Sequence, residues 1–429
     1  MNIGFVSLGC SKNLVDSENI MGLIKAQGYS IVSDPSKADY LFVNTCGFIN
    51  SAKEESISTI LEMAQYKEDR CKKLFVLGCL AQRYKEQLVS ELPEVDRFIT
   101  IDEYPHLPTI LRREMNKEFI SCDYKRVIST KPWTAYLKIA EGCSNRCSFC
   151  AIPLIRHDYR SFDFDEIIAE SKFLQSVGVK EVNVIAQDTT RYGIELYGRS
   201  RLLDILEELN KMDFQWIRVL YMYPDEITEE LIVGMSKLNK VLPYFDIPVQ
   251  YGNDRMLKLM NRRGSIEHIK DMISLIKKVY DKPTLRTTMI VGFPQETEED
   301  FNDLIEFVKD VRWDRLGAFT YSIEEDTKAY DMEPKVEEDM AQSRLKILMD
   351  VQEKIAHENS MNLVGEVMEV LIESVDGLTN MYRGRSRFSA PDGVDGIVTF
   401  KSNNSYKLGE FVKVKIIDAN NHDLIAQEV

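Results

Sequence analysis

The feature that most constrains the fold is an alternation of short apolar runs with helical patterns. Between residues 133 and 335, six runs have the length and composition of buried strands, and helical stretches separate them. Such alternation predicts parallel strands joined by helices. Six units are too few to close an eight-stranded barrel, so we expect a partial (β/α)6 barrel of the TIM type. The runs are Tyr136–Ala140, Glu181–Ala186, Ile217–Met222, Tyr244–Val249, Leu285–Val291 and Leu316–Tyr321.

Two further domains are expected, one on each side of this central segment. The N-terminal residues alternate in the same way and predict a parallel α/β domain at 1–118. The central barrel and the amphipathic helix after it predict a second domain at 130–359. The pattern then changes to strand-like alternation with Gly- and Asn-rich turns, which predicts a small antiparallel, OB-like β-barrel at 361–429. A chain of 429 residues is long enough for three domains.

Three cysteines, Cys143, Cys147 and Cys150, stand close together just after the first central strand. Thiolates at this spacing can bind three irons of a 4Fe–4S cluster and leave the fourth iron open. Reactive residues of such sheets gather at the carboxyl ends of strands. A structural zinc site normally takes four ligands, and His157, a candidate fourth, lies beyond an apolar stretch. We therefore predict a 4Fe–4S cluster, with zinc or unliganded thiols as the alternatives.

Cys10, Cys46 and Cys79 share one context, because each follows an apolar strand-like run. If those strands are parallel neighbours, their carboxyl ends lie about 4.8 Å apart and the three thiols converge. Gly9 and Gly78 precede two of the cysteines and permit tight turns there. The alternative is that each is an ordinary small core residue. We predict that these three thiols bind another 4Fe–4S cluster with an open iron.

Composition bears on the remaining cysteines, on the compartment and on partners. Eight cysteines in a chain with no signal-like N-terminus favour metal ligation over disulfides, and Cys71 and Cys122 are predicted not to be ligands. The sequence has no apolar run long enough to span a membrane, so no membrane contact and a cytoplasmic location are expected. A net charge of −15 disfavours nucleic acid without a local basic patch and suits a basic partner.

Five stretches resemble the methylthiotransferase family of radical S-adenosylmethionine (SAM) enzymes, and the resemblance covers essentially the whole chain. They are Ser7–Glu18, Val43–Ile49, Ile185–Gly193, Ile247–Gln250 and Phe319–Ser322. The first and third are similar to the RimO branch, which modifies an aspartate of small-subunit ribosomal protein S-twelve. The chain departs from the family pattern at His157, Phe162, Tyr251 and Gln295, none of which is a cluster cysteine.

The resemblance implies the chemistry, cofactors and partners. The activity would be transfer of a methylthio group to the β-carbon of that aspartate, with two 4Fe–4S clusters and SAM as both methyl donor and radical source. The partners would be ribosomal protein S-twelve, free or in the small subunit, a one-electron donor such as flavodoxin or ferredoxin, and a sulfur donor. Phe149 would pack by the adenine of SAM, with plain core packing as the alternative. Gln187 and Arg286 would contact SAM or substrate, with a solvated or core-satisfying role as the alternative. No catalytic residue beyond the cluster ligands is implied.

The C-terminal segment resembles the TRAM domain and bears on the choice of substrate. Residues 361–429 carry seven basic and ten acidic side chains, with one basic cluster at Arg383–Arg387. An acid-rich barrel suits a basic ribosomal protein better than tRNA. The same reaction on an adenosine of tRNA is therefore the second hypothesis. A third, an electron carrier, is disfavoured because carriers usually saturate every cluster iron with protein ligands. The acids Glu324–Asp326 are predicted to form an exposed loop.

Overall fold

The computed structural model describes residues 1–116, 119 and 125–429, so Cys122 lies outside the described residues. Its contacts divide the chain into two compact units. Unit 1 comprises residues 1–131, 141–160 and 322–330, and unit 2 comprises residues 132–140, 161–321 and 331–429. All six cysteines predicted as cluster ligands therefore belong to unit 1.

Unit 1 is built on a five-stranded parallel sheet in the order β2-β1-β3-β4-β5. Its strands are β1 (Asn2–Ser7), β2 (Ser30–Val32), β3 (Tyr40–Thr45), β4 (Lys73–Gly78) and β5 (Arg97–Ile99). Its helices are α1 (Ser11–Ala26), α2 (Asn50–Ala64), α3 (Cys79–Glu91), α4 (Leu107–Met115) and α5 (Ile152–Arg156). Short 3-10 turns cover Pro35–Lys37, Gln65–Glu68 and Ile101–His106.

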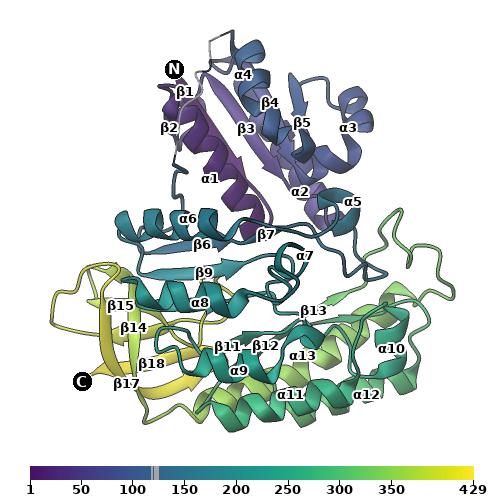
Figure 1. The fold of residues 1–429 in the computed structure, drawn as a ribbon, viewed down its shortest axis with the longest axis vertical. Helices are drawn as coiled ribbons and strands as arrows, with labels where there is room; N and C mark the ends of the chain where they lie inside the picture. The colour runs from purple at the N-terminus through teal and green to yellow at the C-terminus, as the bar shows by residue number, and fades with distance from the viewer. Residues whose placement is uncertain (117–118, 120–124) are drawn as a thin grey trace. The chain divides into compact units, whose positions relative to one another are not determined.

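Helices cover both faces of this sheet (Figure 1). Apolar side chains of α1 and α4 pack on one face, and those of α2 and α3 pack on the other. Because both faces are covered, strands such as β3 are apolar along most of their length, as parallel strands in α/β domains are. Phe5, Phe42 and Phe75 occupy matching positions on three adjacent strands, and their rings stack. The predicted parallel α/β character of the N-terminal region is confirmed.

Unit 2 contains six parallel strands in two three-stranded sheets, β10-β9-β6 and β11-β12-β13. A parallel bridge from Ile217 to Val241 links the β10 strand to the segment before β11. The strands are β6 (Thr134–Lys138), β9 (Glu181–Ile185), β10 (Trp216–Val219), β11 (Tyr244–Asp246), β12 (Thr284–Val291) and β13 (Arg315–Thr320). Each of the six predicted runs overlaps one of them, so the partial (β/α)6 architecture is confirmed. Two short paired strands, β7 (Ala140–Glu141) and β8 (Arg160–Ser161), stand before and after the loop that carries Cys143, Cys147 and Cys150.

Helices follow most of these strands (Figure 1). They are α6 (Phe164–Ser176), α7 (Ile194–Tyr197), α8 (Leu202–Lys211), α9 (Glu229–Ser236), α10 (Asp254–Leu259), α11 (Ile266–Val279), α12 (Glu298–Val311) and α13 (Glu338–Met361), with a 3-10 turn at Pro224–Glu226. The last helix matches the predicted amphipathic helix after the barrel. No helix in the described ranges is both long and apolar enough to cross a membrane.

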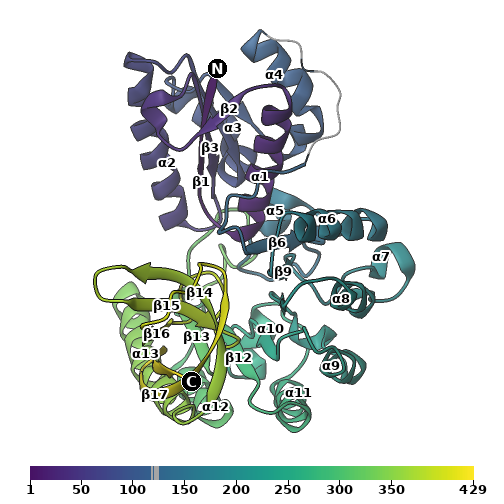
Figure 2. The ribbon, with the colours of Figure 1, turned by 90° about the vertical axis from the view of Figure 1, so that its left-hand side faces the viewer.

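The C-terminal part of unit 2 is a closed five-stranded barrel in the order β14-β15-β16-β18-β17 (Figure 2). Its strands are β14 (Val367–Asp376), β15 (Met381–Ser386), β16 (Val398–Lys401), β17 (Phe411–Asn420) and β18 (Asp423–Glu428). The predicted small OB-like barrel is therefore present. One pair, β16 with β18, runs parallel, so the barrel is not antiparallel throughout.

A buried charge network joins this barrel to the central sheet within unit 2. Glu181 begins β9, and its carboxylate lies 2.5 Å from the guanidinium of Arg385 on β15 and 3.3 Å from that of Arg218 on β10. Thr134 donates a further hydrogen bond to it, at 3.0 Å. Burial raises the pKa of Glu181, but Arg385 and then Arg218 outweigh that effect, and the pKa falls to about 2. The predicted basic cluster Arg383–Arg387 is thus largely a barrel strand with a buried, neutralised arginine at its centre.

Glu181→Gln should destabilise unit 2, because it leaves Arg385 and Arg218 buried with no carboxylate between them. Loss of one partner from a buried ion network lowers the free energy of unfolding by about 3–5 kcal/mol. Urea unfolding at pH 7 measures this change. Glu208→Gln, which removes an exposed ion pair with Lys211, is the control and should change stability little.

The pH dependence of the same variant gives an independent check. Because the folded pKa of Glu181 is depressed, its contribution is fully present above the unfolded value of about 4.3 and is lost as the pH falls towards 2. The stability difference between wild type and Glu181→Gln should therefore shrink below about pH 4. A difference that stays constant to pH 2.5 would contradict the assignment of a charged, paired Glu181.

Candidate functional site

Cys10, Cys46 and Cys79, called the first cysteine set from here on, lie at the carboxyl edge of the unit 1 sheet. Their strands β1, β3 and β4 are neighbours, as the sequence predicted. Cys46 directly follows β3, Cys79 directly follows β4, and Cys10 is the N-cap of α1. Because these strands pair side by side in register, the three cysteines stand at one edge of the sheet. Whether they ligate a cluster stays a prediction.

Two glycines let the backbone approach these thiols. A Cβ on Gly9 would lie 2.8 Å from the Cβ of Cys46 and 3.2 Å from its sulfur. A Cβ on Gly78 would lie 2.2 Å from the side-chain oxygen of Asn44. Both glycines also have positive φ, at +81° and +96°. Any other residue at either position would be strained and would push the cysteine-bearing turns apart.

Polar side chains of the neighbouring helices hold the cysteine turns in place. The Asn13 amide, from the first turn of α1, donates to the carbonyls of Leu8 at 3.1 Å and Thr45 at 2.9 Å. The Ser56 hydroxyl, from α2, accepts from the amide of Cys46 at 3.1 Å and donates to its carbonyl at 2.9 Å. The strand ends that carry the thiols are therefore tied to helices and are not free loops.

Arg156 reaches this edge from α5, which follows the second cysteine set. Its guanidinium lies 2.8 Å from Glu141 and 2.9 Å from Asp16, and both are ion pairs. One of its terminal nitrogens also donates to the Asn13 oxygen at 2.6 Å and to the Cys79 sulfur at 3.7 Å. The sequence gives no signal for this contact, because Arg156 and Cys79 lie 77 positions apart in the chain.

The three thiols differ in acidity for identifiable reasons. Burial raises the pKa of Cys79 to about 12, in spite of the charge of Arg156. Burial also raises the pKa of Cys46. Burial opposes ionisation of Cys10 too, but the charges of Lys12 and Arg156 more than offset it, and the pKa of Cys10 is lowered. Metal binding requires thiolates and so releases protons from such thiols.

The second cysteine set, Cys143, Cys147 and Cys150, lies in a tight loop of the same unit. The amide of Cys143 donates to the carbonyl of His157 at 3.0 Å, and the amide of Cys150 donates to the carbonyl of Cys147 at 3.1 Å. Cys147 and Cys150 line a cavity of about 320 Å³. Its other lining residues are Arg146, Pro153, Leu154, His157, Asp158, Asp326, Thr327 and Lys328. Phe149 lies half-buried in this loop.

The donor set fits iron–sulfur clusters better than single ions. Across residues 1–116, 119 and 125–429, no three His, Cys, Asp or Glu side chains are already gathered where they could hold one metal ion. A single zinc ion draws all its ligands to about 2.0–2.3 Å of one point. In a cubane each thiolate binds its own iron, so the sulfurs stand further apart around an open space. Three thiols at the ends of neighbouring strands, and two more that line a cavity, are a donor set of this second kind.

The two other predicted contact residues lie in unit 2. Gln187 follows β9, and both its amide atoms are buried without a hydrogen-bond partner among the described residues. A buried amide left unsatisfied is costly and suits a site that a ligand completes. Arg286 on β12 lies 2.5 Å from Asp392 and 3.6 Å from Asp246, so carboxylates already balance its charge. That either residue contacts SAM stays a prediction.

The acids Glu324–Asp326 are not simply an exposed loop, as the sequence had suggested. Glu324 is buried, and its carboxylate lies 2.7 Å from Arg83 and 2.8 Å from Lys53. Its neighbours Glu325 and Asp326 are exposed. The correction has a physical reason: two cations from α2 and α3 meet this carboxylate, and sequence spacing alone could not place them there.

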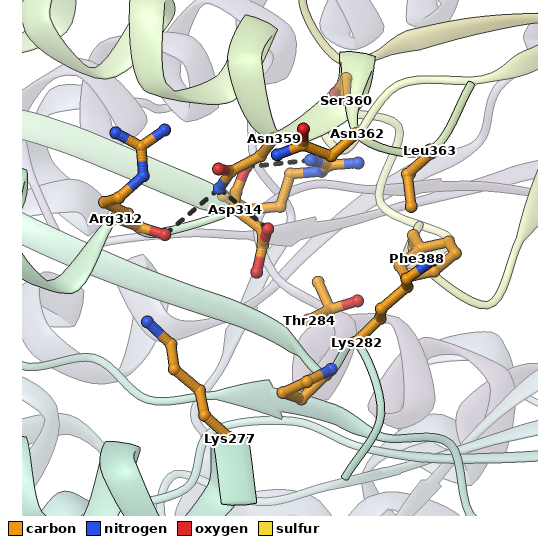
Figure 3. A pocket seen from close by; sticks show the side chains of 12 residues that line it. Lys277, Lys282, Thr284, Arg312, Asp314, Asn359, Ser360, Asn362, Leu363 and Phe388 are labelled. Atoms are coloured by element: carbon orange, nitrogen blue, oxygen red, sulfur yellow. Dashed lines mark hydrogen bonds between the residues drawn. The ribbon is translucent and has the colours of Figure 1, made fainter. Parts of the chain in front are cut away.

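A polar cavity of about 250 Å³ lies in unit 2, at the amino ends of β12 and β13 (Figure 3). The Asn359 amide donates to the Arg312 carbonyl at 3.2 Å and to Asp314 at 3.0 Å across it. Lys277 on its wall donates to the carbonyl of Val311 at 2.8 Å. In barrels of this type the amino ends of strands serve stability, and reactions occur at the opposite ends. We assign this cavity to packing and not to catalysis.

Comparison with known proteins places these features in a family. Residues 2–100 match a family described as uncharacterized protein family UPF0004, residues 137–308 match the radical SAM superfamily, and residues 364–429 match the TRAM domain. The chain is 46% identical over 442 residues to the ribosomal protein uS12 methylthiotransferase RimO of Caldicellulosiruptor saccharolyticus, with all of both chains covered. The chain belongs to the RimO family of radical SAM methylthiotransferases.

Further relatives agree with this placement. The RimO of Clostridioides difficile is 47% identical over 437 residues, which cover 99% of this chain and 98% of the relative. The RimO of Acetivibrio thermocellus is 44% identical over 445 residues, which cover 100% of this chain and 98% of the relative. The family resemblance that the sequence motifs indicated is therefore confirmed.

Solved structures support the fold. The radical SAM methyltransferase TsrM from Kitasatospora setae, with cobalamin and a 4Fe-4S cluster bound, superposes with a TM-score of 0.57. It is 9% identical, and the match covers 77% of this chain and 74% of TsrM. The cobalamin-dependent radical SAM enzyme OxsB superposes with a TM-score of 0.52 at 13% identity, over 82% of this chain and 56% of OxsB. At such identities the likeness shows the fold alone.

His157, one of the departures from the family pattern, has a backbone conformation that suits glycine. Its φ is +60° and its ψ is −164°, a region that is essentially reserved for glycine. Its ring nitrogen lies 2.8 Å from the carboxylate of Asp102, but both side chains are more than half exposed. An exposed pair of this kind contributes little. The strain at this position is therefore only partly offset.

His157→Gly should stabilise the chain by about 1 kcal/mol. A strain of about 2 kcal/mol, the middle of the usual range, exceeds the entropy cost of a new glycine, about 0.5–1 kcal/mol, together with the weak exposed contact. Thermal unfolding measures the change. Asn116→Gly is the matched control, because Asn116 already sits in the left-handed region that asparagine tolerates and should change little. A lower melting temperature for His157→Gly would show that the Asp102 contact outweighs the strain.

Proposed function

We propose that this chain transfers a methylthio group to the β-carbon of an aspartate in ribosomal protein uS12. The observation that carries the proposal is the pairing of full-length relatives named RimO with two three-cysteine sets in one compact unit. An unactivated C–H bond lies beyond any side-chain base, so the chemistry must come from cofactors that the protein positions. Two sets of three thiols each leave one coordination site open, which an electron carrier would not need.

Each cysteine set and each predicted SAM contact has a distinct role in this proposal. Cys143, Cys147 and Cys150 would hold one 4Fe–4S cluster. Cys10, Cys46 and Cys79 would hold the other. When bound, the clusters and SAM supply one-electron chemistry and the transferred methyl group. Phe149, Gln187 and Arg286 are the candidate SAM contacts, and Gln187 has the firmest support because its buried amide lacks a partner among the described residues.

The same proposal implies partners and a compartment. One-electron chemistry needs a donor such as flavodoxin or ferredoxin, and the added sulfur needs a sulfur donor. A ribosomal protein, free or in the small subunit, would be met in the cytoplasm. The barrel supports a protein substrate over tRNA, because Arg385 at the centre of its basic cluster is buried and paired with Glu181 and Glu373. A barrel that grips tRNA needs exposed cations for the phosphates.

Iron content tests the two-cluster proposal. After anaerobic reconstitution the wild-type chain should bind about eight irons, four for each cubane cluster. The triple variants Cys10→Ala/Cys46→Ala/Cys79→Ala and Cys143→Ala/Cys147→Ala/Cys150→Ala should each bind about four. Cys71→Ala is the control, because Cys71 is buried among apolar residues of the sheet and should leave the iron content unchanged. A first triple variant that retains all the iron would show that those thiols are not ligands.

Mass spectrometry tests the substrate. Reconstituted enzyme is incubated with SAM, sulfide and a strong reductant, with purified uS12 or with total tRNA. The expected result is one methylthio group in place of one hydrogen on a single aspartate of uS12, and no change in tRNA. Both triple cysteine variants should abolish the product. Methylthiolated adenosine with unmodified uS12 would overturn the assignment and favour the tRNA hypothesis.

A further inference from the structure

Besides the apolar contacts of Ala151 and Ile155 with Cys79, Arg156 connects the second cysteine loop to the first cysteine set. It stands six positions after Cys150, and its side chain is only 1% exposed. Its guanidinium contacts Glu141, 15 positions earlier in the chain, and Asp16 on α1, 140 positions earlier. A buried arginine keeps its charge in a protein, so a fixed positive charge lies inside the unit.

The positive charge of Arg156 lies beside the first cysteine set. One terminal nitrogen of Arg156 serves three partners: the Asn13 oxygen at 2.6 Å, Asp16 at 2.9 Å and the Cys79 sulfur at 3.7 Å. The charge of Arg156 also acts on Cys10 and Cys46. Cys79 is the most buried of the three cysteines, so solvent screens this contact least.

A cation against a cluster thiolate has a defined electrostatic effect. A three-thiolate cubane gains one negative charge on reduction, and a fixed positive charge favours the more negative state. Net charge and hydrogen bonds to the sulfurs are among the factors that set cluster potentials. Asp16 and Glu141 moderate the field as ion-pair partners of Arg156, and the Arg156 nitrogen donates to the Cys79 sulfur itself.

We propose that Arg156 is a positioning residue that orients the Cys79 sulfur and raises the reduction potential of the Cys10/Cys46/Cys79 cluster. The inference rests on the proposed function, because it requires that cluster to exist. It adds a role for a residue that is not itself a ligand. Arg156 follows the loop of the second cysteine set. The reduction potential of the Cys10/Cys46/Cys79 cluster therefore depends on how that loop is folded.

The test measures a potential and not an activity. The full-length Cys143→Ala/Cys147→Ala/Cys150→Ala variant holds only the first cluster, whose midpoint potential is read by redox titration with electron paramagnetic resonance. In this background Arg156→Gln removes the charge, and Arg156→Lys keeps it. We expect Arg156→Gln to lower the equilibrium constant for one-electron reduction at least tenfold, about 59 mV more negative, and Arg156→Lys to change it less.

Arg126→Gln in the same background is the matched control. Arg126 is also buried in unit 1, where its guanidinium lies 3.6 Å from Glu18. It is not among the leading influences on the pKa of Cys10, Cys46 or Cys79, so its loss should change the reduction potential much less. An equal shift in Arg126→Gln and Arg156→Gln would show a general effect of unit 1 stability and would overturn the proposal.

The other outcomes are also decisive. A loaded Arg156→Gln variant with an unchanged potential refutes the inference. If Arg156→Gln folds but loads no iron, Arg156→Lys decides: loading at the wild-type potential supports a role of the charge, and failure to load refutes it. If the background variant itself binds no cluster, the proposed function fails first, and that result is distinct from a failure of the Arg156 inference.

Discussion

The parallel pairing of β1, β3 and β4 is the constraint on which the candidate site depends. Ser7 pairs with Asn44, and Thr45 pairs with Gly78, so the three strands end at one level. Cys46 and Cys79, which directly follow β3 and β4, and Cys10, in the turn after β1, are then brought to the same edge. A register shift of one residue would turn alternate side chains to the other face of the sheet. The stacked phenylalanines of these strands and the Asn13 hydrogen bonds both oppose such a shift.

Each unit also contains a buried charge that joins segments distant in sequence. Arg156 joins the second cysteine loop to α1 in unit 1, and Glu181 joins the barrel to the central sheet in unit 2. A buried ion pair adds little net stability compared with apolar packing, but removing one partner is strongly destabilising. Such pairs therefore favour one arrangement of the segments over others. In unit 1 that arrangement brings a cation to a thiol, so the same contact serves structure and chemistry.

The elements predicted from sequence and those missed differ in a physical way. The strands before Cys10, Cys46 and Cys79 are largely apolar, and the six central strands are rich in apolar and β-branched residues, so both groups are recognisable from the sequence. Strand β15 was missed because its Arg-Gly-Arg-Ser core is polar, and only the fold shows that Glu181 neutralises Arg385. Glu324 was wrongly placed in an exposed loop, and the contacts of Arg156 were not foreseen, for the same reason. Sequence reveals which residues are charged, but the partner of each charge depends on tertiary structure.

The Glu181 network also has a consequence for the order in which the chain can fold. The carboxylate at the start of β9 finds its closest cation, Arg385, about two hundred residues later in the chain. Domains of a growing polypeptide generally fold as units, from the N-terminus onward. Here the central sheet cannot complete its charge balance until the second strand of the barrel has left the ribosome. Formation of the barrel therefore completes the folding of unit 2. In a nascent chain that stalled before the barrel, Glu181 would be buried in the central sheet without Arg385.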